Sequence, residues 1–333
     1  MTDYDDNYRG GPTWPPGSAS TGVAEPTTPP VRPTPAWSDP RRWLLVAVPL
    51  AVLLLVGGFV LFWPHAKPAP SSPPPPPSGK PTVPTGATLF GPSIARPSDL
   101  TRWGSTATDP LPVARVFISG ALPAAWGDDP VLASTSARTT VVLSFKTGTP
   151  EALGAFLKSR PAGQKVYVSY YHEPEDQIAK GTFTAEQYRA TWQRYSPVIR
   201  AAGGIPTLIL QQYTTQAASG RNWRDYYPGD AVDVVAWDAY NPARKTKKPG
   251  YTDYEKKIIP RIEKIATAIG KPWGLAEFGS PIVGTDAERV AWAKAVRRSV
   301  AQHGALWACW WDVKSPGFDD TASSPVRAAW RAP

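Results

Sequence analysis

Short apolar runs alternate with amphipathic segments between residues 87 and 333 of this 333-residue chain. Eight of these runs are rich in β-branched and aromatic residues and are bounded by Gly, Pro or polar residues, which is the pattern of short buried strands. We place the strands at residues 87–93, 114–120, 139–145, 165–173, 205–213, 232–240, 272–278 and 304–312.

Four segments between the predicted strands carry apolar residues at helical spacing. They cover residues 149–160, 184–204, 254–270 and 286–304. Thr, Ser or Asp near their starts and Gly at several of their ends are typical of helix caps. Eight strands with helical crossovers predict a parallel (β/α)8 barrel, the TIM-barrel fold, and a barrel of about 250 residues fits a single domain over residues 87–333.

A different pattern occupies residues 43–63, where two tryptophans enclose an uncharged apolar run. About 20 such residues are enough to cross a bilayer core of about 30 Å, so we predict a transmembrane helix. A cleaved signal peptide would have a shorter apolar core nearer the start of the chain. Arg41 and Arg42 directly precede the run, whereas its other flank has only two lysines. The positive-inside rule therefore predicts a single-pass protein of the cell membrane with a cytoplasmic N-terminus and an extracytoplasmic remainder.

The segments on either side of the predicted span are poor in apolar periodicity. Residues 1–42 are rich in Pro, Gly, Ser, Thr and Asp, so we expect a disordered cytoplasmic tail. Residues 64–86 are dense in proline and should form an extended polyproline II spacer of roughly 60 to 70 Å. The alternative for this second segment is a ligand for an aromatic-groove module.

Composition adds two points. Because Cys309 is the only cysteine, no intrachain disulfide is possible, and its apolar neighbours predict a buried packing thiol. Part of the net charge of +9 lies in a basic loop after the sixth predicted strand, formed by Arg244, Lys245, Lys247 and Lys248. This loop is either a solvated turn or a site for an anionic polymer or lipid head group. We expect a monomer. We also expect no nucleic-acid partner, because the predicted topology places the domain outside the cytoplasm.

Two of the predicted strands end beside a glutamate. Glu173 ends the run KVYVSYYHE before Pro174, and Glu277 lies in PWGLAEF before Gly279. The carboxyl ends of the strands carry the chemistry of a (β/α)8 barrel, so both side chains should lie at the same mouth. Their separation of 104 residues, close to three βα units, places them on the fourth and seventh strands, across the mouth from each other. Retaining glycoside hydrolysis requires two facing carboxyl groups about 5 to 5.5 Å apart.

These residues resemble the retaining glycoside hydrolases of clan A, and the pair His172 and Glu173 is most similar to glycoside hydrolase family 26, the β-mannanase family. The resemblance extends over the whole predicted barrel and is specific at the fourth and seventh strands. It implies that Glu173 is the general acid/base, which must be protonated, and that Glu277 is the nucleophile, which must be ionised. It also implies that Arg115 and Tyr240 hold the Glu277 carboxylate by charge and hydrogen bonding.

Four residues are further candidates for contact with a sugar. The resemblance implies such a contact for His172, and a packed histidine without a role is the alternative. Asp238 is either a buried hydrogen-bonding residue of the barrel rim or a ligand of a sugar hydroxyl. Trp310 and Trp311 are adjacent on the eighth strand, so one of them should face the mouth and stack on a pyranose. No histidine pair has zinc-like spacing, and we predict neither a metal nor a cofactor.

The predicted function is retaining hydrolysis of a β-linked polysaccharide by double displacement at two glutamates, in a domain anchored outside the membrane. The alternative is a catalytically silent barrel that binds cell-wall or capsular glycan, because function resides in the site rather than in the fold. Both glutamates together with Arg115 and Tyr240 favour the enzyme. The sequence leaves open mannan, xylan, mixed-linkage glucan and a self-made exopolysaccharide, as well as endo or exo action.

Overall fold

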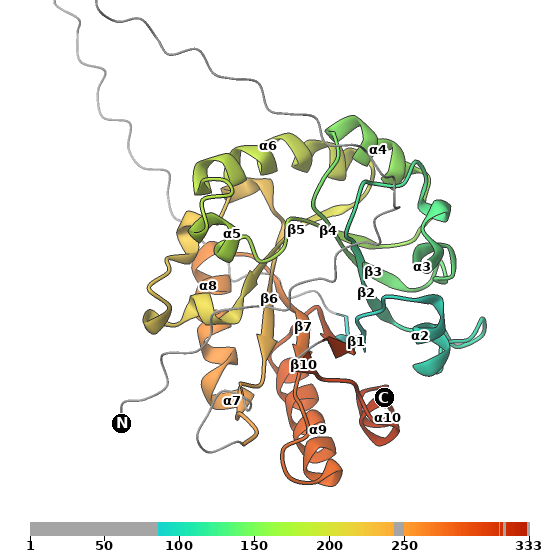
Figure 1. Ribbon diagram of the computed structural model, residues 1–333, viewed down its shortest axis with the longest axis vertical. Helices are drawn as coiled ribbons and strands as arrows, with labels where there is room; N and C mark the ends of the chain where they lie inside the picture. Colours follow the sequence, from blue (N-terminus) through green and yellow to red (C-terminus); the bar gives the residue numbers. More distant parts are fainter. Residues whose placement is uncertain (1–85, 243–249, 313, 316–317, 332–333) are drawn as a thin grey trace, which may run out of the picture. The chain divides into compact units, whose positions relative to one another are not determined.

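Eight parallel strands form one sheet in the computed structural model, which describes residues 86–242, 250–312, 314–315 and 318–331. The strand order is β1-β8-β7-β6-β5-β4-β3-β2 (Figure 1). The strands are β1 Leu89–Pro92, β2 Val113–Ile118, β3 Thr140–Phe145, β4 Val166–Tyr170, β5 Ile205–Gln211, β6 Val234–Tyr240, β7 Trp273–Gly279 and β8 Trp307–Trp310. Ser93 forms a parallel bridge with Arg115, which links β1 to β2. The sheet is therefore a nearly closed barrel of the (β/α)8 type, and the eight predicted strands are confirmed.

Helices connect most of the strands. They are α2 Pro97–Arg102, α3 Pro130–Ala133, α4 Pro150–Lys158, α5 Glu175–Ala179, α6 Ala185–Ala201, α7 Tyr254–Lys257, α8 Ile259–Ile269, α9 Asp286–Gln302 and α10 Ser324–Arg331. The hydroxyls of Thr149, Thr184 and Thr285 cap the starts of α4, α6 and α9. The predicted helical segments correspond to α4, α6, α7 with α8, and α9. An antiparallel pair, β9 Lys314–Ser315 and β10 Phe318–Asp319, follows β8.

The crossover from β5 to β6 contains short 3₁₀ helices in the place of an α-helix. These are η3 Gln212–Thr215, η4 Ala217–Ser219, η5 Trp223–Asp225 and η6 Gly229–Ala231, and a further one, η2 Trp126–Asp128, follows β2. Gly220 and Gly229 have φ values of 64° and 67° in this crossover. Such left-handed positions interrupt a helix, which explains why no amphipathic helical period appears here.

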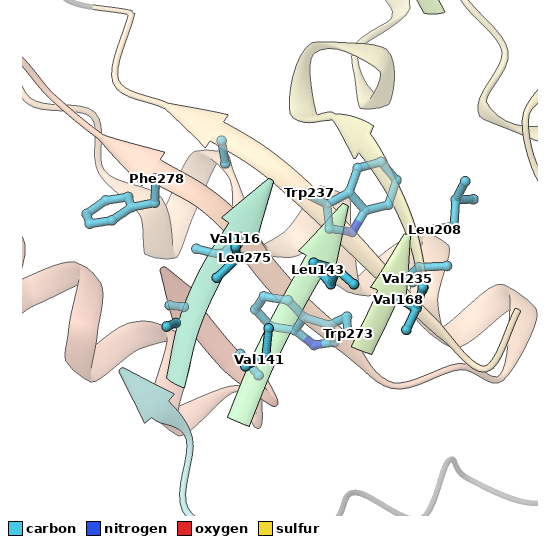
Figure 2. Packing of buried hydrophobic residues seen from close by; sticks show 14 of the residues in the cluster. Val116, Val141, Leu143, Val168, Leu208, Val235, Trp237, Trp273, Leu275 and Phe278 are labelled. Atoms are coloured by element: carbon cyan, nitrogen blue, oxygen red, sulfur yellow. The ribbon is translucent and has the colours of Figure 1, made fainter. Parts of the chain in front are cut away.

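Side chains of the strands alternate between two buried layers. The inner layer fills the barrel and consists of Val113, Val142, Tyr167, Ile209, Val234, Ala236, Ala276, Trp307 and Cys309. The outer layer packs between the strands and the helices, and Figure 2 shows part of it, including Leu143, Val168 and Leu275. Both faces of every strand are therefore covered, as is usual for parallel sheets. The prediction that Cys309 is a buried thiol is confirmed.

The seventh strand interrupts this alternation next to Glu277. Leu275 belongs to the outer layer and Ala276 to the inner layer. The register with β6 then shifts, so that Leu275 is paired with Trp237 while Glu277 is paired with Asp238. One extra residue on β7 is a β-bulge, and it turns a side chain that regular alternation would direct outward. The bulge thus directs Glu277 into the barrel mouth beside Ala276.

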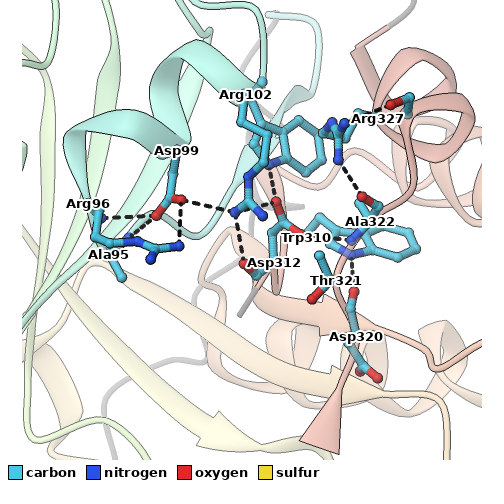
Figure 3. A network of polar contacts seen from close by, with 12 residues as sticks. Ala95, Arg96, Asp99, Arg102, Trp310, Asp312, Asp320, Thr321, Ala322 and Arg327 are labelled. Carbon is cyan, nitrogen blue, oxygen red and sulfur yellow. Dashed lines mark hydrogen bonds and ion pairs between the residues drawn. The ribbon is translucent and has the colours of Figure 1, made fainter. Parts of the chain in front are cut away.

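A network of polar contacts fixes the chain where β8 leaves the barrel (Figure 3). Asp312 directly follows Trp311, and its carboxylate accepts from the Ala322 backbone at 2.7 Å. It also forms an ion pair with Arg102 at 3.0 Å, and Arg102 in turn pairs with Asp99 at 3.0 Å. These contacts connect α2 to the segment that precedes α10 and hold Trp311 in a fixed position.

Several predicted features lie outside the described residues. They are the tail, the span at 43–63, the linker up to residue 85, and the basic loop at 244–248. In the part of the chain that is described, no helix has both the length and the apolar character needed to cross a membrane.

Candidate active site

Glu277 is held by two side chains from the barrel interior. The Arg115 guanidinium lies with Nη2 3.4 Å from Glu277 Oε1, and the Tyr240 hydroxyl donates to Glu277 Oε2. Arg115 is itself fixed, because its Nη1 donates to the Ser144 hydroxyl at 2.7 Å. All four residues are buried. The structure thus brings together the three residues that the sequence placed on strands β2, β6 and β7.

The electrostatics of Glu277 are a balance between burial and these contacts. Burial is the largest effect and leaves its pKa raised, whereas the charge of Arg115 and the hydrogen bond from Tyr240 oppose this rise. Burial raises the pKa of Tyr240 well above its usual range, and the charge of Glu277 adds to this. Tyr240 therefore remains a proton donor over the ordinary pH range. An ionised carboxylate with two fixed donors is suited to act as a nucleophile.

Glu173 lies after the end of β4 on a left-handed segment. Its φ is 49° and that of Tyr171 is 46°. The Glu173 amide donates to the Ile209 carbonyl at 3.1 Å, which keeps the residue beside β5. The predicted end of the fourth strand at Glu173 was wrong, because β4 ends at Tyr170, and β7 continues past Glu277 to Gly279. The carboxyl groups nevertheless interact across the mouth, since the charge of Glu277 acts on Glu173.

The pKa of Glu173 is raised well above its usual value. Burial is the main cause, and the charges of Glu277, Glu175 and Asp176 act in the same direction. A hydrogen bond with the Gln211 side chain opposes the rise in pKa. The two glutamates therefore differ in environment, since Glu277 has a cation and a donor and Glu173 has neighbouring acids. This difference favours a protonated Glu173 beside an ionised Glu277.

A polar cluster after β4 and β5 supports Glu173. Glu175 is buried, and its Oε1 accepts from the Gln211 backbone at 2.9 Å and from the Thr214 hydroxyl at 2.8 Å. Burial raises the pKa of Glu175 to about 7. Arg221 donates both to the Gln211 amide oxygen and to Asp176. Gln211, beside Glu173, is thus held by Glu175 through its backbone and by Arg221 through its side-chain amide.

His172 and Asp238 are buried next to this pair. Burial and the charges of Arg115 and Lys146 lower the pKa of His172 well below its usual value, so the ring is neutral. Its Nδ1 has no hydrogen-bond partner among the described residues. The same holds for both carboxyl oxygens of Asp238, whose pKa is raised well above its usual value by burial and by the charge of Glu277. The hydrogen bonds considered for Asp238 are therefore not found in the described part of the protein.

Trp310, the last residue of β8, and Trp311, which follows it, lie on opposite faces, and the structure distinguishes them. Trp310 packs in the outer layer against Phe278 and Trp330, and its indole donates to the Asp320 carbonyl at 2.9 Å. Trp311 makes edge contacts with Phe117 and Tyr240 at centroid distances of 5.5 and 6.3 Å. Because Tyr240 also contacts Glu277, Trp311 belongs to the site. The candidacy of Trp310 was wrong, because it packs in the outer layer beneath the helices and does not face the mouth.

Lys146 is a site residue that the sequence analysis missed. It follows the last residue of β3 and is half-buried. Its ammonium lies 5.1 Å from the centroid of the Tyr171 ring. Burial lowers its pKa, and the charges of Glu173 and Glu277 raise it. The rule that selected the two glutamates, a polar residue at the carboxyl end of a barrel strand, also applies to Lys146 and could have found it.

Metal coordination has no evident basis in this part of the protein. In residues 86–242, 250–312 and the described segments after them, no group of three or more His, Cys, Asp or Glu side chains is arranged to hold a metal ion. The arrangement that is present consists of two carboxyl groups in different environments, an imidazole, an ammonium and aromatic rings. Such a set can donate a proton and provide a nucleophile.

Comparison with known proteins places the fold. No protein-family model matches the chain, and no curated protein matches it. A family 128 (subgroup II) endo-β-1,3-glucanase from Sorangium cellulosum has a TM-score of 0.51 and 14% identity over 74% of this chain and 99% of its own. A family 17 β-1,3-glucanosyltransferase from Rhizomucor miehei has a TM-score of 0.50 and 10% identity over 72% and 96%. A family 26 endo-β-1,4-mannanase domain from Bacillus sp. JAMB-750 has a TM-score of 0.46 and 14% identity over 68% of this chain and 77% of its own. The barrel is therefore similar in fold to the family 128 and family 17 structures.

Proposed function

We propose that the barrel is a retaining glycoside hydrolase that cleaves a β-linked polysaccharide with Glu277 as nucleophile and Glu173 as general acid/base. The observation that carries the proposal is the contrast between the two carboxyl groups. Glu277 is bound by Arg115 and Tyr240, whereas burial and neighbouring acids raise the pKa of Glu173. Retaining hydrolysis needs this division between an ionised and a protonated group.

In the first step a Glu277 oxygen attacks the anomeric carbon while the bond to the leaving oxygen breaks. Glu173 gives its proton to that oxygen, and a glycosyl ester of Glu277 forms. The ester has no charge, so one cause of the raised pKa of Glu173 disappears. Glu173 can then take a proton from water, whose oxygen attacks the anomeric carbon and releases Glu277. The same interaction thus favours the acid in the first step and the base in the second.

The stereochemistry of the first product tests this mechanism. Proton NMR of the early reaction should show the product with the β configuration of the substrate, because two displacements restore it. Initial formation of the α anomer would contradict the proposal. Glu277→Ala should abolish turnover of every substrate, whereas Glu173→Ala should spare aryl glycosides with activated leaving groups, which need little proton donation. Equal losses on both kinds of substrate would contradict the assigned roles.

The substrate panel follows from the comparisons and from the sequence. It contains mannan, xylan and mixed-linkage glucan, and also laminarin, because the Sorangium cellulosum and Rhizomucor miehei structures, with TM-scores of 0.51 and 0.50, are described as β-1,3-glucan enzymes. If no polymer is cleaved but one is bound, the barrel is a glycan-binding protein without activity. Release of short products from internal sites, followed by viscosity, would distinguish endo from exo action.

We further propose that the barrel works outside the membrane, anchored by the apolar run at residues 43–63. The run is long enough to span a bilayer, and Arg41 and Arg42 precede it. Protease added to intact cells should remove the barrel and leave a tag on the N-terminus intact. Protection of the barrel in intact cells, with digestion after lysis, would contradict this orientation.

A further inference from the structure

Lys146 occupies an unusual position in the mouth of the barrel. It directly follows Phe145, whose carbonyl accepts from the Tyr171 backbone at 2.8 Å, so it lies beside the segment that carries Glu173. Its ammonium is placed over the Tyr171 ring at 5.1 Å, and it is half-buried. The charges of both glutamates act on it. Lys146 thus lies within electrostatic reach of both glutamates, and the mechanism described above does not use it.

The ammonium of Lys146 has no ion-pair or hydrogen-bond partner among the described residues. The other cations of the site are paired, Arg115 with Glu277 and Arg221 with Asp176. A contact with an aromatic ring compensates a cation only in part, by about 0.5 to 2 kcal/mol. Lys146 is therefore partly dehydrated without a direct ion pair, although the charges of Glu173 and Glu277 reach it.

Three further acids of the site, which form no ion pair with Lys146, have raised pKa values. Burial raises the pKa of Asp238 and of Glu173 well above their usual values, and that of Glu175 to about 7. Their raised pKa values make these three groups weaker counter-charges for Lys146 than ordinary carboxylates. Arg115 and Arg221 each pair with one carboxylate, whereas Lys146 forms no ion pair among the described residues. An anion of the substrate can therefore pair with Lys146.

We propose that Lys146 binds an anionic substituent of the sugar at the cleavage site, so that the enzyme acts on acidic β-glycans, with uronate residues as the test case. The choice of a β-glycan as ligand rests on the proposed function, and the choice of an anionic group rests on the position of Lys146. A neutral sugar would cover the ammonium and remove more of its water without replacement. A carboxylate on the sugar would replace that water with a charge-assisted hydrogen bond.

Binding experiments in a stalled protein test the inference. In Glu173→Gln the amide resembles the protonated acid, so natural substrates should bind without rapid turnover. The probes are cellotetraose and laminaritetraose, and the same tetrasaccharides with C6 of each unit oxidised to a carboxylate. Calorimetry should show about 10- to 100-fold tighter binding of the oxidised form of whichever linkage binds. Adding Lys146→Gln should abolish this preference, and Lys146→Arg should keep part of it.

Lys165 offers a matched control. Its ammonium lies 5.0 Å from the centroid of the Tyr167 ring, but it is exposed and precedes β4 at the opposite end of the barrel. Lys165→Gln removes the same charge and the same kind of contact, so it should leave the preference unchanged. If Lys165→Gln and Lys146→Gln weaken binding equally, the preference is a property of overall charge and the inference is wrong.

The outcomes separate this inference from the proposed function. Tight binding of oxidised tetrasaccharides that depends on Lys146, without hydrolysis of any substrate by the unmodified protein, would support the anion site and contradict the enzyme. Hydrolysis of neutral glucans with equal affinity for neutral and oxidised tetrasaccharides would support the enzyme and overturn the anion site. Sulfated tetrasaccharides that bind as oxidised ones do would show that the site recognises charge rather than a carboxylate.

Discussion

Tyr240→Phe isolates one hydrogen bond to the nucleophile. The Tyr240 hydroxyl donates to Glu277 Oε2, and both residues are buried. Phenylalanine keeps the ring and its edge contact with Trp311, so the substitution removes one donor and little packing. Arg115 still pairs with the other oxygen of Glu277 at 3.4 Å. The perturbation is therefore confined to the balance between ionised and protonated Glu277.

The magnitude follows from the kind of bond that is lost. A hydrogen bond to a charged group contributes about 1.5 to 3 kcal/mol, which corresponds to a factor of about 10 to 150 in the equilibrium between ionised and protonated Glu277. This bond lowers the pKa of Glu277, so its removal raises that pKa. At pH values where Glu277 of the variant is protonated, kcat/KM should fall by about that factor. At higher pH, where Glu277 is ionised in both proteins, the loss should shrink.

The assay is the pH dependence of kcat/KM with an activated aryl glycoside, for which proton donation by Glu173 matters little. The acid limb should move to higher pH in Tyr240→Phe. Tyr195→Phe is the control, because Tyr195 donates to the Gly148 carbonyl rather than to a carboxylate. It should lower stability by about 1 kcal/mol and leave the pH profile unchanged. A loss in Tyr240→Phe that is equal at every pH would refute the reasoning, since it would show that Tyr240 does not control ionisation.

Three further predictions concern stability, measured by urea unfolding. Burial raises the pKa of Glu175 from 4.5 to about 7, so protonated Glu175 contributes about 3 kcal/mol to the free energy of unfolding below pH 4.5, and this contribution is lost as the pH rises through 7. Glu175→Gln should flatten this part of the stability profile. Arg115→Ala leaves Glu277 buried without a cation and should cost about 3 to 5 kcal/mol, with a cost below 1 kcal/mol contradicting the ion pair. Gly274→Ala places a Cβ 2.8 Å from an indole carbon of β8 and should cost about 1 to 3 kcal/mol, whereas Gly120→Ala meets nothing within 4 Å and should be nearly neutral.

The barrel itself could be predicted because its strands are covered on both faces. Runs such as TTVVLSF and VDVVAWDAY carry apolar residues at consecutive positions and so on both faces, and the structure places strands at Thr140–Phe145 and Val234–Tyr240 within them. The spacing of the runs then gave the order of strands along the chain. Predicted strand ends were less accurate, because a run of β-forming residues continues beyond the last ladder hydrogen bond.

The choice between Trp310 and Trp311 could not be made from sequence. Alternation requires one of them to face inward, and this proved correct. Trp307 and Cys309 of β8 lie in the inner layer, so alternation directs Trp311, two residues after Cys309, to the same side. Both layers are apolar, so the sequence alone does not distinguish inside from outside. Lys146 was missed for a different reason. Only glutamates were selected at the strand ends, although a lysine lies at the equivalent position after β3.

The orientation of the nucleophile depends on a feature that has no signature in a single sequence. In strict alternation from Trp273 and Leu275, which face the helices, Glu277 would also face the helices and would lie far from Arg115. The bulge at Ala276 and Glu277 reverses this direction. The reversal is stabilised where it is needed, because Arg115 and Tyr240 bind Glu277 directly after the bulge.

The acid/base is oriented by a comparable departure from regular structure on the other side of the mouth. Tyr171 and Glu173 both adopt positive φ, a conformation that costs about 1 kcal/mol or more for residues with a side chain. Two backbone hydrogen bonds hold them there, from Tyr171 to Phe145 on β3 and from Glu173 to Ile209 on β5. The turn keeps Glu173 among buried groups that favour its protonated form. A regular continuation of β4 would change the direction of its side chain and with it the contact with Gln211. The two irregularities, a bulge at Glu277 and a left-handed turn at Glu173, therefore create the difference between the carboxyl groups on which the proposed chemistry depends.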